Sequence, residues 1–306
     1  MAAVFIAGMI FTEVADNEFY FFASYVVLQA VIMATAWNIL GGYTGYVNFG
    51  SAGFFGVGAY TAIALHKAFG LPLPLLILAA AALSGLIGLG AGYLTLRIKG
   101  VYFAIATLAL AIVFETIAIN WEFVGGASGA YILTPEEFLF FDSYIEMLFM
   151  VILSLAIGSA IVARYLSTSR IGQGLAAIRD DEIAAECNGV PTLKLKLIST
   201  SVMGAMMGVA GAPYPFFVTY VDPASAFNLL IAVNAIAMPM IGGTATWLGP
   251  VIGALVVGGM QEIITVTISS EMNLLVVGVM LVGFITLAPK GIVGLVQDYL
   301  KKRRSR

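Results

Sequence analysis

Residues 41–60 read GGYTGYVNFGSAGFFGVGAY, a stretch with seven glycines between two long hydrophobic runs. The runs cover residues 19–40 and 49–66, and each approaches the length of about 20 residues that a helix needs to cross a bilayer. Backbone that is not helical is tolerated at membrane depth only where protein or a water-filled cavity surrounds it. The stretch therefore predicts two membrane-spanning helices with an inward-facing break or a close packing site between them.

Composition extends this prediction to the whole chain. Of the 306 residues, 61% are hydrophobic and 10% are charged, and the mean hydropathy is +1.01, whereas about 25% of residues in a soluble domain are charged. Further apolar segments lie at 72–96, 101–120, 144–166, 197–219, 226–245, 247–268 and 272–289. We expect an all-α, polytopic integral membrane protein with about 9–10 transmembrane helices, in which residues 1–306 form a single transmembrane domain. Residues 1–12 are short for a span, and whether they cross the membrane stays open.

Basic residues predict the orientation, because Lys and Arg are retained on the cytoplasmic side. Of the fourteen basic residues, only Lys67 stands apart from three connections. These connections hold Arg97 and Lys99; Arg164, Arg170, Arg179, Lys194 and Lys196; and Lys290, Lys301, Lys302, Arg303, Arg304 and Arg306. Counting crossings places all three on one side and the acid-only stretches 13–18 and 122–146 on the other. We therefore expect a cytoplasmic C-terminus with a basic tail at 297–306.

Side-chain chemistry argues against an enzyme. Cys187 is the only cysteine and His66 the only histidine, so a disulfide and a clustered metal site are both excluded. The chain has no G-x-x-x-x-G-K-[ST] phosphate loop and no G-x-S-x-G nucleophile elbow. We predict no catalytic residue and no metal site.

The most polar internal stretch is SRIGQGLAAIRDDEIAAECNGVP, residues 169–191, within a loop at about 167–196. Ile171, Leu175 and Ile178 recur at helical spacing and predict a short amphipathic helix. The acids 180–182 favour the start of a second short helix, which Gly189 closes. The pattern has two interpretations: a surface helix that lies at the membrane interface, or a helix on which a partner docks.

Several stretches together resemble the permease subunits of branched-chain amino acid ABC importers. They are SRIGQGLAAIRDDEIAAECNGV, NILGGYTGYVNFGSAGFFGVGAYTAIAL, LRIKGVYFAIATLALA, IGGTATWLGPVIGAL and LAPKGIVGL. Together these stretches extend from about residue 25 to 296, which is nearly the whole chain. In the Glu-Ala-Ala element of ABC permeases the glutamate would stand at Ile183, and here Glu182 lies one place early.

The resemblance implies an ABC-importer permease fold and a heteromeric complex in the plasma membrane of a prokaryote. The implied partners are a second homologous permease, two cytoplasmic ATPase subunits, an extracytoplasmic substrate-binding protein and the lipid bilayer, with no nucleic acid. ATP and Mg would be bound by the ATPases and no cofactor by this chain. The expected ATPase-coupling residues are Arg170, Gly172, Arg179, Asp180, Asp181, Glu182, Ala184, Ala185 and Gly189.

The glycine clusters have two compatible interpretations, close helix packing and a lining for the translocation path. The residues concerned are Gly41, Gly42, Tyr43, Thr44, Gly45, Asn48, Gly50, Ser51, Gly53, Gly56, Gly242, Gly243, Gly249 and Pro250. Glu115 lies in the segment 101–120, where a carboxylate at membrane depth costs about 2.5–3.5 kcal/mol on insertion scales. It is a candidate substrate contact, or it lies near the outer interface.

The predicted function is the permease subunit of an ATP-driven importer for leucine, isoleucine and valine. An importer for urea or short amides would share the architecture, and the sequence does not separate the two. A secondary transporter or channel would need ionisable groups within its spans, and the sequence offers few beyond Glu115 and Glu262. A membrane scaffold would leave the polar loop at 169–191 without a role.

Overall fold

The computed structural model describes residues 5, 8, 9 and 12 and the ranges 18–132, 143–267, 270–287 and 291–304. Some predictions fall wholly or partly outside these residues. They concern a membrane crossing by residues 1–12, the acidic stretches 13–18 and 122–146, and the basic residues Lys290 and Arg306.

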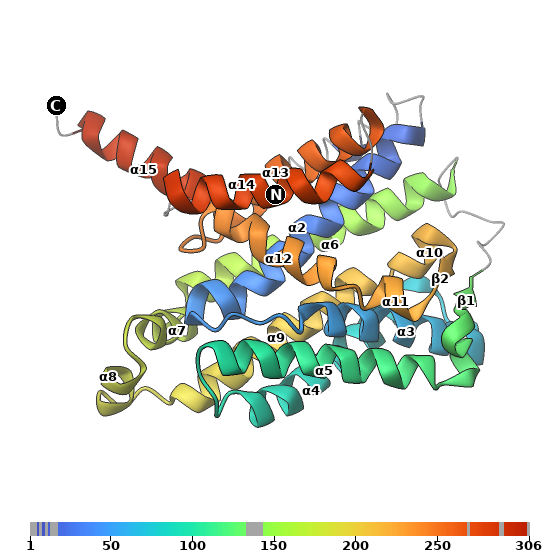
Figure 1. The fold of residues 1–306 in the computed structure, drawn as a ribbon, viewed down its shortest axis with the longest axis horizontal. Helices are drawn as coiled ribbons and strands as arrows, with labels where there is room; N and C mark the ends of the chain where they lie inside the picture. The colour runs from blue at the N-terminus through green and yellow to red at the C-terminus, as the bar shows by residue number, and fades with distance from the viewer. Residues whose placement is uncertain are drawn as a thin grey trace.

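The described residues are helical almost throughout, which confirms the predicted all-α fold class (Figure 1). The helices are α2 (Glu18–Thr44), α3 (Ser51–Phe69), α4 (Leu73–Thr95), α5 (Val101–Ile119), α6 (Tyr144–Thr168), α7 (Arg170–Asp180), α8 (Glu182–Cys187), α9 (Thr192–Gly211), α10 (Tyr214–Val218), α11 (Pro223–Ala226), α12 (Leu229–Gly242), α13 (Leu248–Thr267), α14 (Ser270–Leu287) and α15 (Gly291–Arg304). The 3-10 turns η1 (Glu122–Val124) and η2 (Gly126–Ser128) precede strand β1 (Ala130–Tyr131), and β2 (Tyr220–Val221) follows α10.

Seven helical stretches of the described residues are long and apolar enough to cross a bilayer, which makes this a multi-pass membrane protein. They are Glu18–Thr44, Leu73–Thr95, Val101–Ile119, Tyr144–Thr168, Thr192–Val218, Pro223–Gly242 and Leu248–Thr265. The two other predicted segments, 49–66 and 272–289, also form helices, α3 and α14. Helix α3 falls outside the seven although it has 19 residues, because glycine, serine, histidine and lysine lower its hydropathy.

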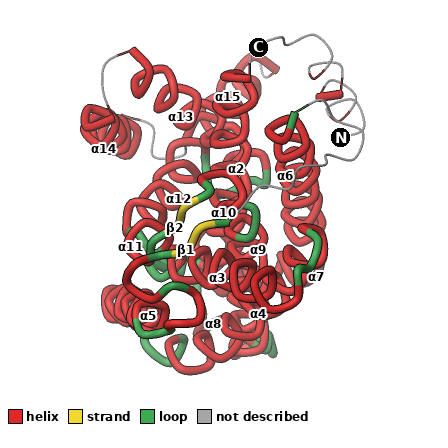
Figure 2. The backbone as a smooth tube through the Cα atoms, turned by 90° about the vertical axis from the view of Figure 1, so that its right-hand side faces the viewer, coloured by secondary structure: helices red, strands yellow, loops and turns green. Residues whose placement is uncertain are grey.

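Helix α2 forms the centre of the bundle. Every residue from Gln29 to Thr44 is buried, and α2 contacts α6, α9, α12 and α13. A helix that is buried on all sides has no need of an amphipathic pattern. Seen along the bundle in Figure 2, α3 and α9 lie inside, whereas α5 and α6 lie at opposite edges. The outer face of α5 exposes apolar side chains such as Tyr102 and Ile105, as lipid contact requires.

Small residues bring α3, α4 and α9 close together. A Cβ atom added to Gly88 of α4 would lie 2.8 Å from the carbonyl oxygen of Thr200 in α9, and one added to Gly58 of α3 would lie 2.6 Å from the Cα of Gly208. Real side chains do not fit at such distances, so these helices pack backbone to backbone. Small residues at helix interfaces are the usual means of close approach in membranes.

The two ends of the bundle differ in structure (Figure 1). The left-hand end carries α7, α8, the α4–α5 connection and the end of α15, whereas β1, β2 and α10 lie at the right-hand end. The strands pair antiparallel, with Ala130 opposite Val221 and Tyr131 opposite Tyr220. This two-stranded sheet, which the sequence pattern does not predict, ties the α5–α6 connection to the chain after α10. Among the described residues, the α4–α5 connection, the 164–196 region and the end of α15 therefore lie at one end.

Candidate functional site

The polar loop folds as the two short helices that its pattern predicts, α7 and α8. Ser169 caps α7, because its Oγ accepts a hydrogen bond from the Gly172 amide at 3.2 Å. Asp181 caps α8, because its Oδ1 accepts from the amides of Ile183 and Ala184 at 2.9 and 3.0 Å. Side chains of this type satisfy the free N–H groups of a first helical turn. Two adjacent caps thus fix a sharp corner between α7 and α8.

The outer side of α8 is exposed. Ile183 is 69% exposed, and Ala184 and Cys187 are exposed beside it, whereas Ala185 is buried. Gly189 follows α8 with a φ of +80°, a left-handed conformation that glycine adopts without strain. Helix α8 therefore presents a small, partly apolar surface at the end of the bundle.

Helix α7 joins this surface to the bundle. Gly172 is buried, and a Cβ atom there would overlap the carbonyl oxygen of Leu166 at the end of α6. Arg170 is exposed at the start of α7. The Arg179 guanidinium donates to the Gly42 carbonyl at 3.5 Å and pairs with Asp180 at 3.3 Å, and the Asp180 side chain is 73% exposed. The polar loop at 169–191 thus touches the glycine-rich end of α2.

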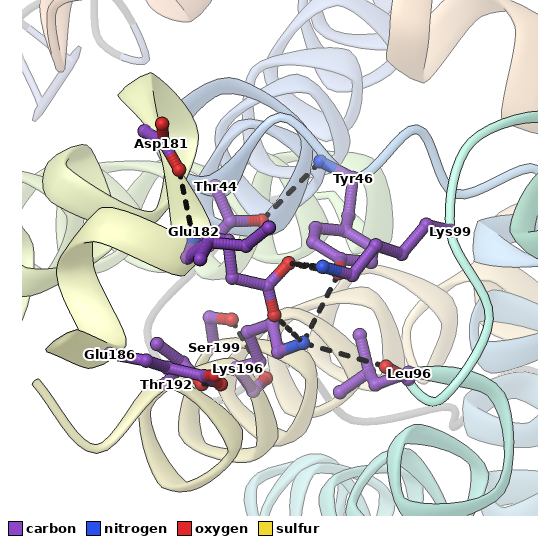
Figure 3. Close-up of polar contacts among 11 residues, drawn as sticks. Thr44, Tyr46, Leu96, Lys99, Asp181, Glu182, Glu186, Thr192, Lys196 and Ser199 are labelled. Carbon is purple, nitrogen blue, oxygen red and sulfur yellow. Dashed lines mark hydrogen bonds and ion pairs between the residues drawn. The ribbon is translucent and has the colours of Figure 1, made fainter.

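Glu182 points inward, into a cluster of charges (Figure 3). Its Oε1 lies 2.6 Å from the Lys196 Nζ of α9, and its Oε2 lies 2.8 Å from the Lys99 Nζ of the α4–α5 connection. The Tyr46 hydroxyl, between α2 and α3, donates to Oε2 at 2.9 Å and accepts from Lys196 Nζ at 3.1 Å. Lys196 Nζ also lies 3.5 Å from the Leu96 carbonyl oxygen. We call Glu182, Lys196, Lys99 and Tyr46 the inner ion cluster.

Three of the four side chains of the inner ion cluster lie largely away from water, whereas Lys99 is 59% exposed. Lys196 is 3% exposed and Tyr46 8%, and the Glu182 side chain is 14% exposed. Burial alone would raise the pKa of Glu182, but hydrogen bonds from Lys196, Lys99 and Tyr46 outweigh it and lower the pKa from 4.5 to about 2. The hydrogen bond to Glu182 raises the pKa of Lys99. Glu182 is therefore a carboxylate throughout the physiological pH range.

A second contact joins α8 to α9 one turn away. The Thr192 hydroxyl donates to the Glu186 Oε1 at 2.5 Å. Glu182 and Glu186 are four residues apart on α8, and Thr192 and Lys196 are four residues apart on α9, so each pair shares a face. Two parallel contacts thus hold α8 against the first turns of α9.

The first glycine cluster lies at the break between α2 and α3. Gly45 ends α2 with a φ of +78°, and its amide donates to the Gly41 carbonyl at 3.0 Å. Residues 45–50 are not helical. The Asn48 side chain accepts from the Gly50 amide at 2.7 Å, and the Asn48 carbonyl accepts from the Trp37 indole at 2.9 Å. These contacts satisfy polar groups of a turn in which Tyr46, Asn48 and Gly50 are buried, whereas Gly45 and Val47 are exposed.

Most of the cluster's small residues face neighbouring backbone or rings. A Cβ atom at Gly50 would meet the Thr107 carbonyl of α5, one at Gly53 would lie 3.0 Å from the Ala111 Cα, and one at Gly56 would meet the Phe227 ring. Close packing, one of the two interpretations, is thus how α3 lies against α5. Thr44 donates to the Leu40 carbonyl at 2.5 Å, and Tyr43 to the Ala163 carbonyl of α6 at 3.4 Å.

The second cluster packs α12 against α13. A Cβ atom on Gly242 would overlap the Gly249 carbonyl, and one on Gly249 would overlap the Gly243 carbonyl. Gly243 ends α12 with a φ of +116°, and Pro250 is buried in the first turn of α13. This corner is far in sequence from the inner ion cluster. The Thr244 carbonyl beside it accepts from Asn38 of α2 at 3.2 Å.

Two cavities lie along the α3–α5 side of the bundle. The one nearer the inner ion cluster has a volume of about 550 Å³ and is lined by Tyr46, Lys99, Phe103 and Arg179, among others. The other, about 390 Å³, is lined by Glu115 of α5, Asn228 and Phe227. Phe49 lines both. Its amide is fixed by a 3.2 Å hydrogen bond to the Thr107 hydroxyl of α5.

The structure brings the polar loop at 169–191 together with the first glycine cluster through Arg179 and Gly42. Glu115 shares a cavity with Phe49 of the same stretch, and Gly42 lies against the Thr244 carbonyl beside the second cluster. Sequence reasoning missed Tyr46, Lys99 and Lys196 as site residues and counted the two lysines only as markers of orientation. One signal was available for Lys196, since it directly precedes the predicted apolar segment 197–219 and needs a partner if buried.

A bundle of apolar helices with a capped polar loop at one end defines a multi-pass membrane protein. Residues 19–285 match the family described as branched-chain amino acid transport system, permease component. This match covers most of the chain, and the chain belongs to that family.

Similar relatives carry related names. The high-affinity branched-chain amino acid transport system permease protein LivM of Salmonella typhimurium is 25% identical over 297 residues, and that of Escherichia coli is 26% identical over 301. Each alignment covers 89% of this chain and 69% of the relative. The probable branched-chain amino acid transport permease protein LivH of Methanocaldococcus jannaschii is 28% identical over 281 residues, which are 85% of this chain and 86% of the relative.

Proposed function

We propose that this chain is the membrane-spanning permease subunit of an ATP-driven importer for the branched-chain amino acids leucine, isoleucine and valine. The family match over residues 19–285 carries the proposal, since it includes each of the seven apolar spans except the first residue of α2. The names of the relatives support the substrate class.

The proposed partners are a second related permease, two cytoplasmic ATPases that hydrolyse ATP with Mg, and an extracytoplasmic binding protein. Support for an ATPase partner comes from α8, whose exposed Ile183, Ala184 and Cys187 form a surface at one end of the bundle. Arg179 and Asp180 lie beside it and add charge.

The proposed location is the plasma membrane of a prokaryote, with the α7–α8 end in the cytoplasm. The basic residues of the α4–α5 connection and of the 164–196 region lie at this end. The C-terminal end of α15 lies there too (Figure 1). Retention of basic residues in the cytoplasm supports the orientation.

The proposed translocation path follows the two cavities along α3 and α5, with Phe49 between them. Glu115 is the only charged side chain among the described residues that line the 390 Å³ cavity, and a carboxylate there suits the ammonium group of an amino acid. Ser51, which precedes the cavity-lining Ala52 in α3, has a buried hydroxyl for which the described residues offer no hydrogen-bond partner. ATP-driven motion of α8 would alternate access to this path from the two sides.

Uptake of labelled leucine tests the proposal. Cells without their own leucine importers would express this chain with its genomic neighbours, in the presence of excess valine or excess urea, with and without ATP depletion. We expect ATP-dependent uptake that valine blocks and urea does not. Entry of labelled urea in place of leucine would move the substrate to urea or short amides, and uptake that survives ATP depletion would favour a secondary transporter or channel.

A further inference from the structure

We infer that Glu182 and Lys196 are positioning residues for energy coupling: their ion pair fastens α8 to the bundle so that α8, α9 and two neighbouring turns move together. The inference rests on the proposed function, because it takes α8 as the surface on which an ATPase acts.

The first step concerns the two sides of α8. Ile183, Ala184 and Cys187 face outward, whereas Glu182 and Glu186 reach α9. A partner that pushes on the exposed side therefore acts on a helix whose other side is already bound. Glu182, which the sequence predicts as a docking residue, instead pairs with Lys196 and Lys99 of the same chain.

The second step concerns the two attachment points. Glu182 binds Lys196 at 2.6 Å and Glu186 binds Thr192 at 2.5 Å, one helical turn apart on both helices. One contact would allow α8 to pivot, but two in parallel hold its direction relative to α9. Displacement of α8 is thus passed to α9, which packs against α2, α3 and α4.

The third step concerns the turns that lead into the cavity-lining helices. Tyr46 lies five residues before α3 and Lys99 two residues before α5, and both bind Glu182. Lys196 Nζ also donates to the Leu96 carbonyl, which lies in the same α4–α5 connection as Lys99. A single carboxylate therefore ties α8 to the entrances of both helices beside Phe49 (Figure 3).

The fourth step concerns the strength of the connection. Lys196 is almost fully buried, so separation from Glu182 would leave a charge without a partner in a poorly solvated place, which is strongly unfavourable. The inner ion cluster therefore stays closed as α8 moves, and the motion goes into the helices.

The test uses the complete transporter in proteoliposomes and compares Glu182→Gln, Lys196→Met, the double variant and Lys194→Met. Lys194 is a matched control, since it is exposed and lies two residues from Lys196. Two quantities are measured: the yield of assembled transporter, and the ratio of leucine transported to ATP hydrolysed. We expect each single variant to lower the ratio about five-fold or more, at the low end of coupling between distant sites.

The double variant separates coupling from stability. It removes both charges, so no unpaired charge stays buried and the assembled yield returns. The ratio stays low, because only the Glu186–Thr192 contact then holds α8 to α9 and α8 can pivot. A ratio that recovers with the yield would show that the pair only stabilises the fold and would overturn the inference, as would normal ratios in both single variants.

A second readout does not depend on the substrate. Val47 is 42% exposed and lines the 550 Å³ cavity, so Val47→Cys in a Cys187→Ser background reports on the α2–α3 turn. We expect ATP to change its maleimide labelling rate with Glu182 present and not with Glu182→Gln. If ATP changes labelling but leucine is not moved, the proposed substrate fails and the inference stands. Equal ATP responses would reject the inference, and a chain that binds no ATPase would reject both.

Discussion

Three neighbouring carboxylates in the polar loop at 169–191 have three different surroundings. Asp180 is exposed, Asp181 caps α8, and Glu182 enters the inner ion cluster. Reversing the charges at Arg179, Asp181 and Glu182 together would therefore remove a helix cap and a buried pair as well as any docking contact. Substitution of the exposed Ile183 addresses docking more directly.

The lowered pKa of Glu182 predicts a pH dependence of stability. A group whose folded pKa is depressed stabilises the fold above its unfolded pKa and loses this effect as the pH falls through the folded value. The melting temperature of wild type should exceed that of Glu182→Gln by a constant amount at neutral pH. The gap should shrink between pH 4.5 and about 2. Thermal unfolding in detergent measures it, and a gap that widens on acidification would contradict the assignment.

Glu115 predicts a change in substrate affinity. Glu115→Gln removes the negative charge from the 390 Å³ cavity, and loss of a charged hydrogen bond of about 1.5–3 kcal/mol corresponds to a KM for leucine at least about ten-fold higher. Initial uptake rates over a range of leucine concentrations measure it.

Glu262→Gln is the matched control, because Glu262 lines a separate cavity between α2, α6 and α13. Equal effects of the two substitutions would remove Glu115 from the proposed path.

At the level of helices, contact through glycine predicts a position-dependent cost of added volume. Gly88→Leu places a side chain against the Thr200 carbonyl of α9 and should destabilise the bundle by about 1–3 kcal/mol. Gly90→Leu lies on the same helix with nothing within 4 Å, so it controls for helix propensity and should cost nothing. Melting temperatures of the purified proteins in detergent check this, and equal losses would argue against close packing of α4 on α9.

Local sequence patterns predict the helices well, because hydropathy and capping act over short distances. The predicted segment 101–120 is α5 (Val101–Ile119). Of the acids predicted to open the second short helix, Asp181 caps α8 and Glu182 begins it, whereas Asp180 is the last residue of α7. Contacts between helices are a different matter. Glu182 is 136 residues from Tyr46 in the chain, and no periodicity links such positions. The same applies to the pairing of β1 with β2 and to Phe49 as a wall shared by two cavities.

At the level of the whole molecule, Cys187 predicts the orientation directly. It is the only cysteine of the chain, and it is exposed on α8. A membrane-impermeant maleimide should label it in inside-out vesicles and not in intact cells, and bound ATPases should protect it.

Cysteine at the other end provides the control for the labelling experiment. Ala127→Cys in a Cys187→Ser background lies in the exposed turn η2, so it should be labelled only from outside. Labelling of Cys187 in intact cells would invert the proposed topology.

The inner ion cluster also has an evolutionary consequence. Because Glu182 satisfies a buried lysine and two further partners at once, loss of the carboxylate alone is costly, and a lineage can abandon it only with a compensating change. Positions 46, 99, 182 and 196 should therefore be inherited as a set, and family members that lack an acid at 182 should also lack a lysine at 196.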